Sequence, residues 1–183
     1  PAARRDISVI HARDVDLRAM LELPPDAPAP RRVTNGIDGP RVAMILAVLQ
    51  RKAGLKLHTR EVYVSTVGGA RVSDPATDLA AAVAIASACA ERAFDRPIIA
   101  VGEVGLSGEL RRVPGTERRL AEAARLGFEL ALVPSGSQVK IAGLRVVEAA
   151  TLADALGMLQ LRREVQQTTT RLDPARRHLA AVE

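Results

Sequence analysis

The sequence predicts an α/β fold, and three features of its 183 residues support this prediction. Short segments with the alternation of β-strands are followed by longer segments with helical periodicity, the order expected of mixed sheets with packed helices. Hydrophobic residues make up 48% of the chain, which is enough for a sizeable core. Aromatic residues make up only 2%, so this core must consist mainly of alanine, valine, leucine and isoleucine.

The first thirty residues are expected to form a separate segment. Residues 6–12 alternate loosely and could form a strand, and residues 15–23 carry a short helical pattern. Four prolines within residues 24–30 predict an extended linker. We therefore divide the chain into an N-terminal segment with linker (1–30), one main domain (31–160) and a polar C-terminal tail (161–183) with at most weak helices.

Turn and cap residues mark the elements of the first half of the domain. Residues 40–53 predict a helix that begins after Asp38 and ends at Gly54. Residues 61–67 alternate like a strand. Asp74 is the expected N-cap of a second helix over residues 76–94, which is nearly all small or apolar and should therefore be buried.

The second half of the domain continues the alternation. Strands are predicted at 97–101, 110–113, 128–133 and 144–147, with a turn at 105–108 that allows 110–113 to pair with its neighbour. An amphipathic helix is predicted over 116–126, with Gly127 as its C-cap. A last helix over 151–159 begins at Thr151, followed three residues later by Asp154.

Several classes of function are disfavoured. The single cysteine, Cys89, allows no internal disulfide and no cysteine-based metal site, and is expected to be a buried small residue. Neither GxxxxGK[ST] nor GxGxxG occurs, so nucleotide binding by those motifs is not expected. No apolar run is long enough for a membrane span and no signal peptide is evident, so a cytoplasmic protein is expected. The formal net charge of +5 is compatible with a polyanionic partner.

Three blocks of sequence resemble a known family. They are Thr34-Asn35-Gly36-Ile37-Asp38 with the helix that follows, Asp74-Pro75-Ala76-Thr77-Asp78-Leu79-Ala80, and Gly102-Glu103-Val104-Gly105-Leu106-Ser107-Gly108-Glu109-Leu110-Arg111 with the next helix. Their order and spacing resemble the C-terminal domain of the bacterial RadA/Sms DNA-repair ATPases. That domain is similar to the proteolytic domain of Lon protease, so the resemblance implies a Lon-like fold over about residues 31–159.

The resemblance also implies that the chain is not a protease. Lon-type catalysis uses a serine activated by a lysine that has lost its proton. Ala76 holds the serine position here and Arg119 holds the lysine position. A methyl group cannot attack a carbonyl, and a guanidinium stays protonated at neutral pH. Both dyad positions are therefore degenerate, and no catalytic residue is assigned.

A rearranged nucleophile is kept as an alternative. The hydroxyls near these segments belong to Ser73, Thr77 and Ser107, but no lysine lies close to them in sequence. The ordinary interpretation of Thr77 and Asp78 is helix first-turn chemistry. For the two glutamates of the third block, Glu103 and Glu109, the ordinary interpretation is a solvated turn.

RadA/Sms proteins resemble RecA-type ATPases that work as hexameric motors on branched recombination intermediates. If this chain belongs there, the sites for ATP, magnesium and zinc lie upstream, and this part holds no cofactor and no metal. The resemblance implies a homo-hexameric ring scaffold, contact with double-stranded or branched DNA, a RecA-type recombinase as a further partner, and no membrane. It also implies that the cytoplasmic protein is associated with the nucleoid. A pure assembly scaffold without DNA contact is the second alternative.

Basic side chains are the candidates for DNA contact, because phosphates require only positive charge and give binding that is independent of sequence. For each one alone, a solvated surface or an intersubunit ion pair is the better explanation, and only the set as a whole points to DNA. The scarcity of aromatics argues against stacking on single strands. The candidates are Arg31, Arg32, Arg41, Arg51, Lys52, Lys56, Arg60, Arg111, Arg112, Arg118 and Arg119.

Overall fold

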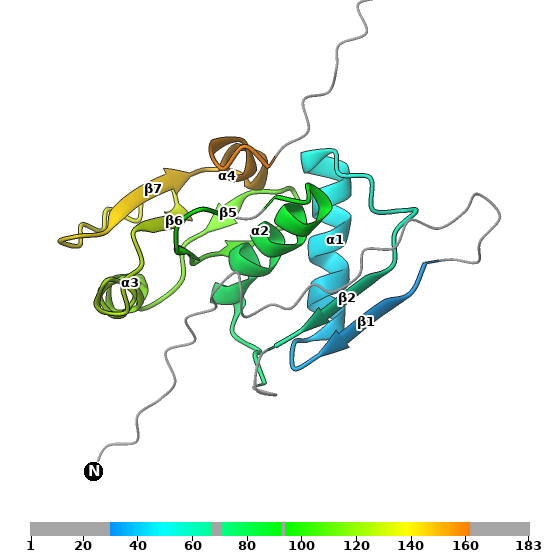
Figure 1. Cartoon of the computed structure of the whole chain (residues 1–183), viewed down its shortest axis with the longest axis horizontal. Coiled ribbons are helices and arrows are strands. Elements are labelled where there is room, and N and C mark those ends of the chain that lie inside the picture. The colour runs from blue at the N-terminus through cyan, green and yellow to red at the C-terminus, as the bar shows by residue number, and fades with distance from the viewer. Residues whose placement is uncertain (1–29, 67–70, 93, 162–183) are drawn as a thin grey trace, which may run out of the picture.

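A computed structural model describes residues 30–66, 71–92 and 94–161. It has a mixed α/β architecture with small parallel and antiparallel sheets, which confirms the predicted class (Figure 1). The strand at 6–12, the helix at 15–23, the linker at 24–29 and most of the tail lie outside the described residues. The predictions for these segments are therefore untested.

The N-terminal part of the domain is a strand–helix–strand unit. Strand β1 (Arg32–Asn35) leads into helix α1 (Gly39–Ala53), and β2 (Val62–Ser65) then pairs in parallel with β1. Helix α1 begins as predicted, because the Asp38 carboxylate accepts the Arg41 N–H at 3.0 Å. It ends at Gly54, whose φ of 72° is readily adopted only by glycine.

The buried helix begins with a tighter turn than predicted. Residues Pro75–Thr77 form a 3₁₀ turn, η2, and α2 (Asp78–Cys89) follows, so the helix ends five residues earlier than expected. Asp74 caps the turn as predicted. Apart from Ser87 and Ala88, every residue of α2 is buried, and Cys89 is 9% exposed, which confirms the interpretation of both the helix and the cysteine.

The remaining elements form a three-stranded parallel sheet and a hairpin. The sheet has the order β3 (Ile98–Ala100), β6 (Leu130–Pro134), β7 (Arg145–Ala149). The hairpin pairs β4 (Glu103–Val104) with β5 (Leu110–Arg111) across the predicted turn. Helix α3 (Thr116–Arg125) precedes β6, and α4 (Leu152–Met158) follows β7.

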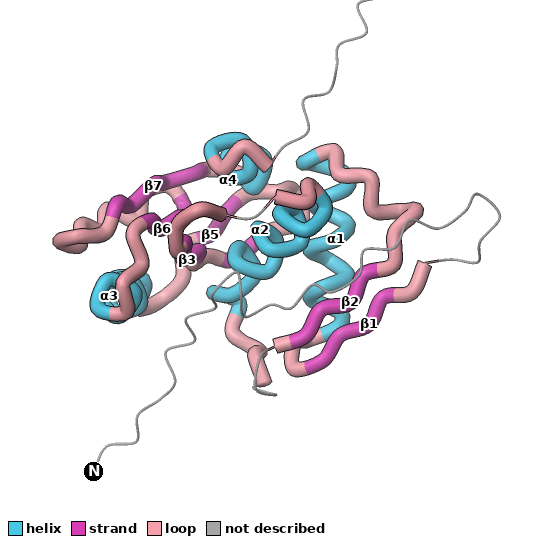
Figure 2. The backbone as a smooth tube through the Cα atoms, viewed as in Figure 1, coloured by secondary structure: helices cyan, strands magenta, loops and turns pink. Residues whose placement is uncertain are grey.

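Figure 2 shows α1 and α2 between the β1–β2 pair and the three-stranded sheet, with α3 at the far side of that sheet. The larger core cluster joins α1, α2 and α4, and the smaller one lies where α3 packs on β3 and β6. Both are built almost entirely from alanine, valine, leucine and isoleucine, as the composition predicts. Gly102 allows the close approach of β6, because a Cβ there would lie 2.8 Å from the Pro134 ring.

Candidate functional site

The two positions that the resemblance assigned to a dyad, Ala76 and Arg119, share one carboxylate. Ala76 is 2% exposed, and its N–H donates to Asp74 Oδ1 at 2.9 Å. The guanidinium of Arg119, on α3, donates to the other oxygen of the same carboxylate, Asp74 Oδ2. The structure thus brings together two residues that lie 43 positions apart in the sequence. Asp74 joins them, although the sequence analysis assigned it only a capping role.

The hydrogen bonds at this site favour the ionised form of the Asp74 carboxylate. Partial burial opposes ionisation of Asp74, but hydrogen bonds from the Ala76 N–H and the Arg119 guanidinium outweigh it and lower the pKa of Asp74. The side chain of Arg119 is 18% exposed. Asp74 and Arg119 therefore form a compensated ion pair, and the two positions indicated by the resemblance hold neither the hydroxyl nor the neutral amine that Lon-type chemistry would need.

The alternative hydroxyls have no base in the described part of the chain. Thr77 is 4% exposed, and its hydroxyl donates to the Asp74 carbonyl at 2.7 Å. This hydroxyl is therefore already used in a hydrogen bond within its own turn. Ser73 and Ser107 are exposed. Within the described part of the chain, none of the three hydroxyls is hydrogen-bonded to a lysine or a histidine.

A buried ion pair lies beside this site and connects α1 to the start of α2. The Arg41 guanidinium binds the Asp78 carboxylate through two bonds, at 2.5 and 3.0 Å. Asp78 is 1% exposed, and it also accepts the N–H of Val104 from β4 at 3.2 Å. Burial raises the pKa of Asp78, against the opposing effect of Arg41. The hydrogen bond from Arg41 to Asp78 raises the pKa of Arg41.

The ion pairs continue from Arg41 to the exposed hairpin. Arg41 lies 3.9 Å from Glu103, Arg111 lies 3.8 Å from the same carboxylate, and Arg111 binds Glu109 at 2.5 Å. Glu109 also accepts the N–H of Ser107 at 3.1 Å, which fastens the turn. Glu103 and Glu109 lie at a partly solvated turn, as expected, and the structure adds that both are ion-paired. The position of Asp78 in the sequence predicts that it lies in the first turn of a helix, but it does not predict the ion pair with Arg41.

Several of the arginines that are candidates for DNA contact interact with carbonyl or carboxylate groups of their own domain. Arg60 is 8% exposed and donates to the Cys89 carbonyl at 3.4 Å, where it caps the end of α2. Its burial does not fit a role in surface contact. Arg32 donates to the carbonyls of Leu57 and Arg60. Arg31 lies 4.0 Å from Glu61, and Arg112 donates to the Gly136 carbonyl at 3.1 Å.

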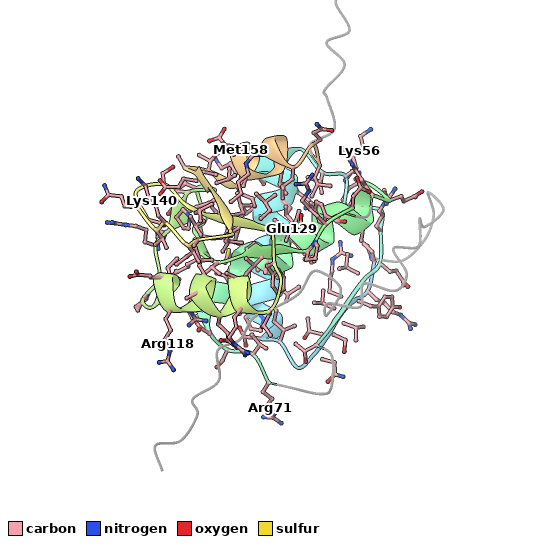
Figure 3. The ribbon with its side chains drawn as sticks, turned by 60° about the vertical axis from the view of Figure 1, so that its left-hand side comes forward. Lys56, Arg71, Arg118, Glu129, Lys140 and Met158 are labelled. Carbon is pink, nitrogen blue, oxygen red and sulfur yellow. The ribbon has the colours of Figure 1, made fainter. Side chains whose placement is uncertain are left out.

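The remaining basic candidates are exposed, and no carboxylate of a described residue lies within 4.0 Å of them. They are Arg51, Lys52, Lys56 and Arg118. The first three gather at the C-terminal end of α1 and in the turn after it. Lys56 and Arg118 lie at opposite sides of the molecule in Figure 3, so the candidates do not form one continuous face.

Two negative findings concern other kinds of site. Within the described residues, no group of three or more histidine, cysteine, aspartate or glutamate side chains is arranged to hold a metal ion. No helix of this part of the chain combines the length and the apolar character needed to cross a bilayer.

Comparison with known proteins gives two results. DNA repair protein RadA of Mycolicibacterium smegmatis is 52% identical over 136 residues, which cover 74% of this chain and 29% of that protein. The RadA proteins of Pseudomonas aeruginosa and Escherichia coli are 44% and 40% identical, over 71% and 70% of this chain. The chain thus spans less than a third of the length of these relatives. Residues 41–137 match the family model described as subunit ChlI of Mg-chelatase, and since they are more than half of the chain, the protein belongs to that family.

Proposed function

We propose that this chain is a non-proteolytic, Lon-like domain of a RadA-type DNA-repair ATPase, which helps to assemble a hexameric ring and to hold double-stranded DNA. The observation that carries the proposal is identity of 38–52% to proteins named DNA repair protein RadA, over 70–79% of this chain. The degenerate pair at Ala76 and Arg119, tied by Asp74, supports the non-proteolytic part.

The whole protein would use ATP to process branched recombination intermediates. In this proposal the ATP, magnesium and zinc sites belong to parts outside the present chain. The matched family model carries the name of a chelatase subunit, but the chain contains no GxxxxGK[ST] phosphate loop that would support nucleotide hydrolysis here. A RecA-type recombinase remains a candidate partner of the whole protein.

DNA contact is assigned to the end of α1. Arg51, Lys52 and Lys56 are exposed, close together in sequence and without carboxylate partners among the described residues. Three exposed cationic groups at one end of a helix suit the phosphates of one duplex backbone. Each phosphate neutralised steepens the dependence of log affinity on log salt concentration by about 0.9.

A salt titration of duplex DNA binding tests this assignment. The variant Arg51→Gln/Lys52→Gln/Lys56→Gln should bind more weakly at low salt, with a slope shallower by up to about 2.7, which is three times the value for one phosphate. Arg118→Gln, on the opposite side, is the matched control and should change neither affinity nor slope. An unchanged slope in the triple variant would remove the α1 end from the DNA-contact surface.

Assembly without DNA contact is the second candidate function. It is favoured by the number of arginines already used in internal pairs, since Arg41, Arg111, Arg119 and Arg125 all bind carboxylates of their own domain. Light scattering after gel filtration measures the ring. Ring formation together with no salt-dependent DNA binding at low ionic strength would leave this candidate alone.

A peptidase with a rearranged nucleophile is the third candidate. Casein cleavage that is lost on changing Ser73 or Thr77 to alanine would support it. The occupied hydroxyl of Thr77 argues against this candidate.

A further inference from the structure

Strand β7 lies at one edge of the three-stranded sheet, because within the described residues it pairs with β6 alone (Figure 1). The N–H of Arg145 and the carbonyl of Ala149 are hydrogen-bonded to residues that flank β6, at 3.0 and 2.8 Å. Backbone groups of successive residues in a strand point to opposite edges, so those of Val146 and Glu148 face outward. The outer edge of β7 therefore offers N–H and carbonyl groups to a further strand.

A groove of about 350 Å³ lies along β7 on one face of the sheet. Its wall is the connection between β6 and β7, which contributes Val139 and Ile141, and Val146 contributes to its floor from β7. All three side chains are half-buried and pack on the smaller core cluster, so the groove is apolar inside. Its volume lies within the usual range of ligand pockets, about 300–1,000 Å³.

Hydrogen bonds hold the wall of the groove in place. The Glu148 carboxylate accepts the N–H groups of Gly136 at 2.7 Å and of Gln138 at 2.8 Å. The Arg112 guanidinium donates to the Gly136 carbonyl at 3.1 Å. Because the connection is tied to β7 in this way, the groove is formed before any ligand arrives, which lowers the entropic cost of binding.

The charges along the groove differ between its two ends. Two exposed cations, Lys140 and Arg145, lie where β7 begins, since the bridge between Ile141 and Leu144 brings the connection back to that point. Neither cation has a carboxylate of a described residue within 4.0 Å. At the other end of β7, the charge of Glu148 is compensated by the two N–H groups that it accepts. The groove therefore matches a ligand that is acidic at one end and apolar in the middle.

We propose that the groove and the outer edge of β7 bind an extended, acidic segment of a partner protein as an added strand. Main-chain hydrogen bonds to Val146 and Glu148 align the segment, and one of its apolar side chains fills the groove. Its acidic side chains pair with Lys140 and Arg145. Recognition by strand addition divides its work in this way, since backbone bonds provide affinity and pockets for alternate side chains provide specificity.

Protection of the edge is the other use of charges at such a place, because many proteins block an edge strand with charged side chains. The two cations of β7 lie at one end only. The middle of the strand, at Val146, carries an apolar side chain beside an apolar groove. This arrangement suits a ligand better than it suits protection of the whole edge.

Fluorescence anisotropy with labelled model peptides, measured on the full chain, tests the proposal. The first probe alternates valine and threonine and carries aspartates at one end. It is made in two versions, with the aspartates first or last, because an added strand can run parallel or antiparallel to β7. A matched probe carries lysines in their place. We expect saturable binding of one aspartate version and weaker binding of the lysine probe.

Two variants separate backbone pairing from charge. Val146→Pro removes an outward N–H but none of the bonds to β6, and should weaken binding at least about fivefold, the effect of one hydrogen bond. Lys140→Glu/Arg145→Glu should weaken binding of the aspartate probe at least about fourfold, about twofold for each exposed ion pair, and should favour the lysine probe instead. Arg96→Glu is the matched control, since Arg96 is exposed just before β3, at the opposite edge of the sheet, and should change neither affinity.

Four results would overturn the proposal. The first is no binding of either aspartate version, and the second is equal binding of the aspartate and lysine probes. The third is charge reversal that leaves the preference unchanged, which decides the matter even if the proline variant does not fold. The fourth is displacement of the peptide by a DNA duplex, since that would assign the groove to nucleic acid. The peptide measurements do not depend on DNA contact at the end of α1 or on ring assembly.

Discussion

Replacing Arg41 with methionine removes the guanidinium that binds the buried Asp78 carboxylate. Asp78 is 1% exposed, so its charge would lie in the interior, and among the described residues only the Val104 N–H would still donate a hydrogen bond to it. Removal of one partner of a buried pair costs about 3–5 kcal/mol. The Arg41 side chain is 25% exposed, so water screens part of the interaction, and we expect about 3 kcal/mol, the lower end of that range.

Urea denaturation of the two proteins measures this loss, and its dependence on pH identifies the cause. Because burial raises the pKa of Asp78 in the folded state, the ionised carboxylate is destabilising above that pKa. The penalty is relieved as the pH falls through the folded value and the carboxylate takes up a proton. The deficit of Arg41→Met should therefore be smaller at pH 5 than at pH 8.

The double variant Arg41→Met/Asp78→Leu is the control, because it removes both charges and replaces them with apolar groups. It should recover much of the lost stability, since a buried pair can often be exchanged for apolar residues at little cost. A deficit below about 1 kcal/mol for Arg41→Met, the value of a surface pair, would refute the reasoning. So would a deficit that is the same at both pH values.

Three further predictions follow from the same structure. Asp74→Asn should make the free energy of unfolding depend less on pH in the acid range. The pKa of Asp74 is lowered in the folded state, so the stability that its carboxylate contributes is complete above the ordinary pKa of 3.8 and is lost as the pH falls toward the folded value. Acid titration followed by circular dichroism measures this difference. Ala76→Ser with Arg119→Lys should not cleave casein, because Asp74 would bind the new lysine and keep it charged; measured cleavage would contradict this. Gly102→Ala should cost about 1–3 kcal/mol in urea denaturation, because its Cβ would meet a proline ring at 2.8 Å, whereas Gly157→Ala, with open space around it in α4, should stabilise by about 0.4–1 kcal/mol.

Elements with strong local signals were predicted well. The caps at Asp38, Asp74 and Thr151 are all present, because each depends on a side chain that bonds to the backbone within three residues. Strand β1 was missed, since its four residues are mostly polar and exposed and show no alternation. The end of α2 was placed too late because the chain leaves the helix at Glu91, which has a left-handed φ of 52° although it is not a glycine.

The candidate site was only partly visible in the sequence. The resemblance pointed to Ala76 and Arg119, and the fold brings them to one carboxylate. The role of Asp74 as their link, and the burial of Asp78, have no local signature. The basic candidates show the same limit, because a list of arginines does not reveal which of them face a carboxylate of their own domain.

The amino-acid identities alone show that the two positions indicated by the resemblance, Ala76 and Arg119, carry neither a nucleophile nor a base. Alanine has no nucleophile and arginine holds its proton in any fold, so the identities of two residues were enough. Periodicity and caps likewise determined most helices, because their bonds join residues close in the chain. Which residues form ion pairs depends on the tertiary structure, since Arg41 and Asp78 are separated by 37 positions and Asp74 and Arg119 by 45. Which charges meet depends on how the helices pack, and local sequence carries no record of that packing.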